Sequence, residues 1–254
     1  MTVLLVYHVL CNKKIEKFIN MTALDINVYV INLKRNPKRL VNFKKNYEKT
    51  DLSHVKFEVI EAVDGKTLDV QSIITEKAHT ELIDAERRGY RTKHYQITRG
   101  AIGCYLSHLE AYKRIVESDK DYGLVFEDDV DFNTSEILQD LQNKIRTIHS
   151  EWDIMLLGCV CYVCNGYKDY YDAQKFILLH AYIVKKESAK KILEELQGNP
   201  IEKQIDSKFS DMAESGKLKV VCLKEQLASQ NNNDYKTTIQ LPIKKIPGVN
   251  PFSN

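Results

Sequence analysis

The chain has 254 residues, of which 43% are hydrophobic and 28% are charged. This balance is typical of one large globular domain and excludes an intrinsically disordered chain. Its 37 lysines and arginines nearly cancel its 35 aspartates and glutamates, and the resulting net charge of +2 argues against a nucleic-acid-binding protein.

The first predicted strand follows an N-terminal extension at residues 1–25. An apolar run within this extension, at 2–10, is too short to span a membrane and lacks the basic start and cleavage site of a signal peptide. We therefore expect a cytoplasmic protein with no transmembrane segment. Residues 26–33 are β-branched and apolar, which predicts a buried strand. A basic loop follows, and its Asn36-Pro37 pair suits the start of a helix.

The rest of the chain alternates between predicted strands and helices. This alternation predicts an α/β fold with a mostly parallel central sheet flanked by helices. Residues 26–240 are interpreted as one domain and residues 241–254 as a C-terminal tail. Further strands are predicted at 55–63, 123–130, 152–163, 176–184 and 218–223, helices at 104–118, 135–149, 187–196 and 201–215, a turn at 64–65, and short helices and loops at 66–97.

An acidic motif, Glu127-Asp128-Asp129, follows directly on a predicted buried strand. Burying like charges is costly unless a cation compensates them, and strands of open α/β sheets deliver ligands to a crevice at their carboxyl ends. In an extended chain Glu127 and Asp129 point to the same side and converge on one ion, whereas Asp128 points elsewhere and is kept as a catalytic candidate. Oxygen ligands suit Mn²⁺ or Mg²⁺, which would bridge the diphosphate of a nucleotide sugar. The alternative is a solvated acidic turn that caps the next helix.

The cysteines do not have the spacing of a small disulfide scaffold, and we interpret them as reduced thiols. A zinc site is the alternative for the group at 159–164, but its fourth ligand would have to come from a distant residue such as His180. Thiols on an apolar strand more commonly pack as small hydrophobic groups. The six positions are Cys11, Cys104, Cys159, Cys161, Cys164 and Cys222.

Several sequence blocks in order resemble one known family. They are VYVINLKRNPKR at 28–39, EAVDG at 61–65, TRGAIGCYLSH at 98–108, LVFEDDV at 124–130, and the segments at 180–193 and 205–206. Together they cover about residues 26–240 and resemble glycosyltransferase family 25, which includes bacterial lipooligosaccharide galactosyltransferases and the collagen hydroxylysine galactosyltransferase domain. The resemblance implies a GT-A type fold, a divalent metal, and an inverting transfer of galactose or glucose from a UDP-sugar. The acceptor would be a hydroxyl group on a glycan or on hydroxylysine.

The resemblance also implies the residues of the donor site. Guanidinium groups pair well with phosphate oxygens, a carboxylate can accept hydrogen bonds from uridine or its ribose, and glycine allows close approach to the donor or to another element. The alternatives are that the arginines lie in a solvated basic turn, that Asp64 is an ordinary turn residue and that His108 is structural. The residues expected to bind the donor are Asn32, Leu33, Arg35, Arg39, Asp64, Gly100, Gly103, Ser107 and His108.

An inverting transfer needs a base that takes the proton of the acceptor hydroxyl. Asp206 is the candidate, and the alternative is an exposed helix carboxylate beside lysines. The late loop at 229–234 has no histidine, although a late histidine often completes the metal shell in the implied fold. Gln230, Asn231, Asp234 or water would take its place.

A different class of function is a catalytically silent domain that keeps the fold and binds a glycan or a protein partner. A metal-dependent phosphodiesterase or nuclease is a third hypothesis, and it would need more acids or histidines than the sequence offers around the motif. The lysine-, asparagine- and isoleucine-rich composition is typical of an AT-rich bacterial or viral genome.

Overall fold

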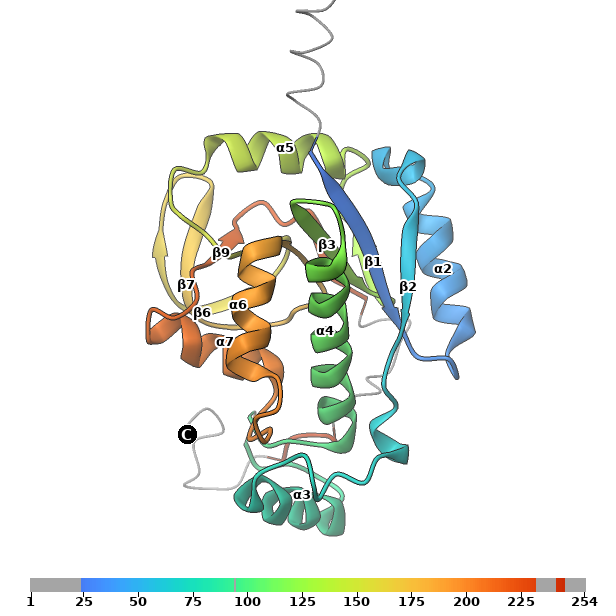
Figure 1. Ribbon diagram of the computed structural model, residues 1–254, viewed down its shortest axis with the longest axis vertical. Coiled ribbons are helices and arrows are strands. Elements are labelled where there is room, and N and C mark those ends of the chain that lie inside the picture. Colours follow the sequence, from blue (N-terminus) through green and yellow to red (C-terminus); the bar gives the residue numbers. More distant parts are fainter. Residues whose placement is uncertain (1–23, 94, 232–240, 245–254) are drawn as a thin grey trace, which may run out of the picture.

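An eight-stranded sheet forms the centre of the structure (Figure 1), a computed structural model that describes residues 24–93, 95–231 and 241–244. In spatial order its strands are β2 (Phe57–Glu61), β1 (Ile26–Asn32), β3 (Tyr122–Glu127), β8 (Ala181–Lys185), β5 (Ile154–Leu156), β9 (Val220–Leu223), β7 (Tyr170–Ile177) and β6 (Val160–Gly166). Strands β8 and β7 run opposite to the other six. The predicted α/β fold with a mostly parallel sheet is thereby confirmed.

Helices cover both faces of the sheet. They are α2 (Pro37–Tyr47), α3 (Glu76–Arg88), α4 (Arg99–Glu117), α5 (Ile137–Thr147), α6 (Lys186–Leu196) and α7 (Ile205–Glu214). One core contains buried residues of α3, α4, α6 and α7, and the other contains those of α2 and α5. Figure 1 shows α4 and α6 side by side in front of the sheet.

Strand alternation decides which side chains meet which helices. In β3, Leu124 and Phe126 pack in the core with α2 and α5, whereas Val125 packs in the core with α4. Because side chains two residues apart point to the same face of a strand, the side chain of Glu127 follows Val125 toward α4. The fold therefore brings the acidic motif to the helix that carries the 98–108 block.

Two helices begin where the sequence offers a cap or a proline. Helix α2 begins at Pro37 as predicted, although the Asn36 side chain makes no capping hydrogen bond. Helix α4 begins at Arg99, before its predicted start, because Thr98 Oγ1 accepts the N–H of Ala101 at 3.1 Å. This earlier start makes the whole glycine-containing block part of α4.

Two predicted strands are each divided in the structure. The run at 152–163 is β5 and β6, separated at Gly158, where a Cβ atom would lie 2.1 Å from the carbonyl oxygen of Ala228. The run at 176–184 is the end of β7 followed by β8, and between them Leu178 has a left-handed φ of 81°. Strands β6 and β7 pair as an antiparallel hairpin that was not predicted.

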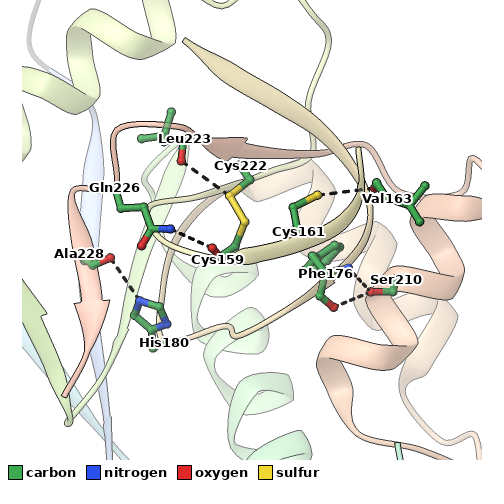
Figure 2. Close-up of a disulfide and its surroundings, with 10 residues drawn as sticks. All are labelled: Cys159, Cys161, Val163, Phe176, His180, Ser210, Cys222, Leu223, Gln226 and Ala228. Carbon is green, nitrogen blue, oxygen red and sulfur yellow. Dashed lines mark hydrogen bonds between the residues drawn. A yellow bond between two sulfur atoms is a disulfide. The ribbon is translucent and has the colours of Figure 1, made fainter. Parts of the chain in front are cut away.

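Cys159 and Cys222 form a disulfide (Figure 2), with Cα atoms 6.4 Å apart. The expectation of reduced thiols is wrong for these two residues, because the parallel pairing of β5 with β9 brings together cysteines 63 positions apart. Such a bond is typical of an oxidising compartment rather than of the cytosol, and closing a loop of this length stabilises the fold by roughly 4 kcal/mol. Neither sulfur is available for the zinc site considered for the 159–164 group.

The disulfide lies beside the segment that leads to β10 (Ala228–Gln230). The Nε2 group of Gln226 donates to the carbonyl oxygen of Cys159 at 2.9 Å, and the Nε2 atom of His180 lies 3.4 Å from the carbonyl oxygen of Ala228 (Figure 2).

No helix among the described residues is long and apolar enough to cross a membrane. Of the predicted N-terminal extension and C-terminal tail, the described residues include only 24–25 and 241–244.

Candidate functional site

The acidic motif lies at a turn between two strands. Strand β3 ends at Glu127, the next two residues form the turn, and the chain continues as β4 (Val130–Phe132), which pairs antiparallel with β10. The extended backbone assumed for Glu127 and Asp129 therefore stops at Glu127. Asp128 and Asp129 are 7% and 8% exposed, and the Glu127 side chain is 14% exposed. Buried carboxylates exclude the alternative of a solvated acidic turn.

Arg39 pairs with two of the three carboxylates. Its Nε atom lies 2.8 Å from Oδ1 of Asp128, and its Nη2 atom lies 2.5 Å from Oδ2 of Asp129. The Nδ2 group of Asn32 donates to Oδ2 of Asp128 at 2.5 Å, and the Nε2 group of Gln230 donates to Oδ2 of Asp129 at 3.3 Å. Burial raises the pKa of Asp128 to about 6 and, with the charge of the neighbouring glutamate, the pKa of Asp129 to about 7. The contacts with Arg39 only partly offset this cost.

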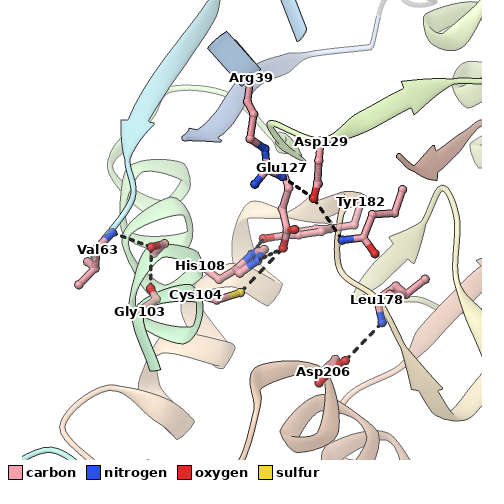
Figure 3. A network of polar contacts seen from close by, with 12 residues as sticks. Arg39, Val63, Gly103, Cys104, His108, Glu127, Asp129, Leu178, Tyr182 and Asp206 are labelled. Carbon is pink, nitrogen blue, oxygen red and sulfur yellow. Dashed lines mark hydrogen bonds and ion pairs between the residues drawn. The ribbon is translucent and has the colours of Figure 1, made fainter. Parts of the chain in front are cut away.

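Glu127 turns away from this pair toward α4 (Figure 3). Its Oε1 atom lies 3.2 Å from Nε2 of His108 and 3.8 Å from Sγ of Cys104, and Nδ1 of His108 lies 2.9 Å from the hydroxyl of Tyr182. Burial alone would raise the pKa of Glu127, but the hydrogen bond and charge interaction with His108 outweigh it and lower the pKa. The predicted donor-site residue His108 is fully buried and orients this glutamate.

A cavity opens between the end of β1, the segment at 62–65 and α4. Most of the residues predicted for the donor or for catalysis line it. They are Leu33, Arg35, Arg39, Asp64, Gly100, Ser107, Glu127 and Asp128, and the remaining wall includes Ile31, Ala62, Val63, Gly65 and Cys104.

Arg35 and Asp64 pair across the mouth of the cavity. The Nε group of Arg35 donates to Oδ2 of Asp64 at 2.5 Å, and the backbone N–H of Lys66 donates to its Oδ1 at 3.1 Å. The hydrogen bond from Arg35 lowers the pKa of Asp64. Asp64 is therefore both a turn residue, as in the alternative interpretation, and an ionised partner for a cavity guanidinium.

Gly103 and Ser107 hold one wall of the cavity in place. A Cβ atom on Gly103 would lie 2.3 Å from the carbonyl oxygen of Val63 and 2.7 Å from the nitrogen of Gly65. The Ser107 hydroxyl donates to the carbonyl oxygen of Gly103 at 2.6 Å and accepts the N–H of Val63 at 2.9 Å. The close approach predicted for Gly103 is thus to another element of the chain.

Gly103→Ala is expected to destabilise the protein by about 2–3 kcal/mol, because the added methyl group overlaps backbone atoms that cannot move independently. Gly166→Ala is the matched control, since its Cβ atom would meet nothing closer than 3.6 Å. Urea denaturation of both variants measures the difference. Equal stabilities would contradict the close packing of α4 against residues 63–65.

Asp206 lies in the first turn of α7 and does not line the cavity. Its Oδ1 atom accepts the N–H of Ser207 at 2.7 Å, and its Oδ2 atom accepts the N–H of the left-handed Leu178 at 3.4 Å (Figure 3). Burial raises the pKa of Asp206, and the charge of Glu127 raises it further. These contacts do not match the exposed carboxylate of the alternative interpretation.

His180 is a site residue that sequence reasoning considered only as a distant zinc ligand. Its backbone oxygen accepts the N–H of Glu127 at 2.8 Å, its ring is 2% exposed, and its Nδ1 atom has no hydrogen-bond partner among the described residues. Burial lowers the pKa of His180. The 180–193 block was the signal that could have placed it opposite the acidic motif.

Of the late-loop candidates, the Asn231 N–H donates to the carbonyl oxygen of Asp129 at 2.8 Å, and Asp234 lies outside the described residues.

The raised pKa of Asp129 predicts a pH dependence of stability. Folded protein keeps this proton between about pH 4 and about pH 7, whereas the unfolded chain releases it near 3.8. The stability gained from Asp129 is therefore present at low pH and lost as pH rises through about 7. The free energy of unfolding of Asp129→Asn, relative to that of the parent, should rise by about 2–3 kcal/mol from pH 5 to pH 8. Urea denaturation with a chelator present measures it. A difference that stays constant across this range would contradict the shift.

Comparisons with known proteins agree with the sequence blocks. A family model described as Glycosyltransferase family 25 (LPS biosynthesis protein) matches residues 25–207. Human procollagen galactosyltransferase 2 is 30% identical over 134 residues, which cover 52% of this chain and 20% of that protein. A rat protein named probable inactive glycosyltransferase 25 family member 3 is 32% identical over 133 residues, covering 52% and 22%. The chain thus spans about a fifth of the length of these curated relatives.

Among solved structures, the chain is similar to a mutant of Drosophila β1,4-galactosyltransferase 7 in complex with manganese, UDP-Gal and xylobiose. The TM-score is 0.42 and the sequence identity is 11%, and the match covers 89% of this chain and 78% of that one.

Proposed function

Because the chain belongs to glycosyltransferase family 25, we propose that it transfers galactose or glucose from a UDP-sugar to a hydroxyl group on a glycan or on a hydroxylysine-type acceptor. The observation that carries this proposal is the cavity between β1 and α4, whose lining includes the guanidinium–carboxylate pair of Arg35 and Asp64 together with Glu127 and Asp128 of the acidic motif. A nucleotide sugar presents a nucleoside, a diphosphate and a hexose in that order, and such a cavity offers partners to the nucleoside and to the diphosphate.

The nucleoside end of the donor is proposed to bind near Arg35 and Asp64. The Arg35 side chain is 38% exposed at the cavity wall, so it can leave its carboxylate partner for a phosphate oxygen. Asp64 is then available to accept hydrogen bonds from the ribose. Leu33 and Ile31 supply an apolar surface for the uracil ring in the same wall.

A divalent ion fits the acidic motif. Arg39 is the close cationic partner of Asp128 and Asp129, and Oδ1 of Asp129 is buried with no hydrogen-bond partner among the described residues. We propose that Asp129 and Glu127 hold Mn²⁺ or Mg²⁺, for which oxygen ligands are preferred. The ion would supply positive charge to the departing diphosphate. Asn32 and Arg39 hold Asp128 at the cavity wall, next to the proposed position of the ion.

In the proposed inverting transfer, the acceptor oxygen forms a bond to the anomeric carbon as the bond from that carbon to the phosphate oxygen breaks. UDP leaves with the electron pair, and the acceptor proton passes to a base. Asp206 is the proposed base, supported by its partly buried carboxylate and by its charge interactions with Glu127 and His108. A raised pKa makes a carboxylate a stronger base.

The test is UDP release by purified protein over a panel of UDP-sugars, with Mn²⁺ or with chelator. We expect release above background with UDP-galactose or UDP-glucose, dependent on the ion and increased by an acceptor hydroxyl. Mass spectrometry of the products then identifies the sugar and the acceptor. No release over the whole panel, with or without Mn²⁺, would refute the transferase.

The alternative is a catalytically silent domain that binds a glycan or a protein partner. It is favoured by one observation, the word inactive in the names of the rat relative and its mouse and bovine counterparts. In that case Mn²⁺ affinity, measured by calorimetry, would be unchanged by Asp129→Asn, and no donor would turn over. An affinity that falls together with turnover supports the transferase.

A further inference from the structure

Cys104, His108 and Glu127 form a cluster of three different metal-ligating side chains. Their ligand atoms all lie within 4.8 Å of one another, with Oε1 of Glu127 at 3.2 Å from Nε2 of His108 and at 3.8 Å from Sγ of Cys104. In a tetrahedral zinc site, the usual metal–ligand bond lengths place such atoms about 3.4 Å and about 3.6 Å apart. Two of the three edges of one face of such a tetrahedron are therefore already close to these lengths, and the third is within 4.8 Å.

The surroundings of the cluster support metal binding. The Nδ1 atom of His108 lies 2.9 Å from the hydroxyl of Tyr182, which leaves Nε2 directed toward the cysteine and the glutamate (Figure 3). A histidine that binds a metal through one nitrogen is commonly oriented by a hydrogen bond at the other. Cys104 and Glu127 also line the cavity, which provides an entry path and a position for a fourth ligand.

The ligand set selects a particular class of ion. A thiolate and an imidazole favour zinc, cobalt and cadmium over manganese and magnesium, which prefer oxygen ligands. The cluster differs in this respect from the acidic motif, whose ligand atoms are all oxygens. Cys104 lies four residues before His108, about one turn away on α4, so both project from one face of the helix.

We propose that Cys104, His108 and Glu127 bind a thiophilic divalent cation such as Zn²⁺, with its fourth position open to the cavity. On binding, the thiol proton of Cys104 passes to solvent and the sulfur binds as a thiolate. Because the ion occupies the wall of the donor cavity and takes an oxygen of Glu127, Zn²⁺ inhibits the transferase. This inhibition rests on the proposed function, whereas the binding itself does not.

The binding test uses Co²⁺, because a cobalt–thiolate bond gives a charge-transfer absorption in the near ultraviolet. Cys161 and Cys164 are the other free cysteines among the described residues, and Cys11 lies outside them. All three are first replaced by serine to give a background protein. We expect this protein to bind one Co²⁺ with the thiolate absorption. Adding Cys104→Ser should abolish the absorption, and adding His108→Gln should weaken Co²⁺ binding at least tenfold. An absorption that persists without Cys104, or that never arises in the background protein, overturns the site.

A second measurement needs no variant and so does not depend on the folding of one. The unmodified protein is treated with N-ethylmaleimide, and alkylation of the Cys104 peptide is followed by mass spectrometry. Zn²⁺ should protect Cys104 at concentrations at which Mn²⁺ does not. Equal alkylation with both ions contradicts the proposal.

The inhibition test measures UDP release at fixed Mn²⁺ with increasing Zn²⁺. The Zn²⁺ concentration for half-inhibition should rise at least tenfold when Cys104→Ser is added to the background protein. An unchanged value means that Zn²⁺ acts elsewhere and overturns the inhibitory role. A protein that shows the cobalt–thiolate absorption but turns over no donor would refute the transferase while leaving the metal site intact.

Discussion

Asp129→Asn is expected to lower UDP-sugar turnover on the order of 10²–10³-fold while the protein remains folded. The substitution keeps the shape of the side chain and removes its negative charge, and Oδ1 of Asp129 is a buried oxygen without a hydrogen-bond partner among the described residues. If this oxygen holds a divalent ion, its loss removes charge stabilisation from the departing diphosphate. Turnover is measured with saturating UDP-sugar, and Mn²⁺ affinity is measured by calorimetry on the same samples.

The matched control is Asp131→Asn, two residues along the same segment. Asp131 lies in β4 outside the donor cavity, and its replacement should leave turnover within about twofold, as expected for a substitution away from the site. Stability should not fall in Asp129→Asn at pH 8, because the parent carries an ionised and buried carboxylate there at a cost. Full activity in Asp129→Asn would refute its role in metal binding.

Asp206→Asn is expected to lower the turnover number by on the order of 10²–10⁴-fold with little change in donor affinity, because a base acts in the transition state and not in donor binding. An asparagine oxygen can still accept the N–H of Leu178 or Ser207, so the local backbone should be retained. The control is Asp211→Asn on the same helix, where the carboxylate pairs with Lys203 at 2.6 Å. That variant should keep near-parental turnover.

The pH dependence of turnover by the parent protein gives an independent check on the proposed base. Burial raises the pKa of Asp206, so the rate should fall on the acid side at a pH above the usual range of an aspartate. The acid limb should disappear in Asp206→Asn. Equal losses in turnover and donor affinity would instead assign Asp206 to donor binding.

Much of the fold could be predicted because its signals are local. The β-branched run of β1, the proline that begins α2 and the apolar segment of β3 each determine their own element. The acidic motif was likewise found from its neighbours, because a buried strand that ends in three carboxylates is unusual at any position. Family blocks then connected these elements to one cavity, which most of the predicted donor-site residues line.

The remaining features depend on contacts between distant segments. The partners of the three carboxylates are set by which face of β3 meets α4, and this is why Glu127 meets His108 while Asp129 meets Arg39. The division of the 152–163 run depends on the approach of Ala228 to Gly158. The disulfide depends on the pairing of β5 with β9. No local periodicity carries such information, because each contact joins residues that belong to different elements of the fold.

The covalent link at Cys222 has a consequence for the acidic motif. Four residues beyond it, Gln226 is bonded to the backbone of Cys159, and four residues further Gln230 donates to Asp129. Strand β10, which contacts the motif, is therefore held in place near both of its ends. It would lose little conformational entropy on the binding of an ion. Such preorganisation strengthens binding without adding a contact. Under the proposed metal binding, an oxidised chain should hold the ion more tightly than a reduced one.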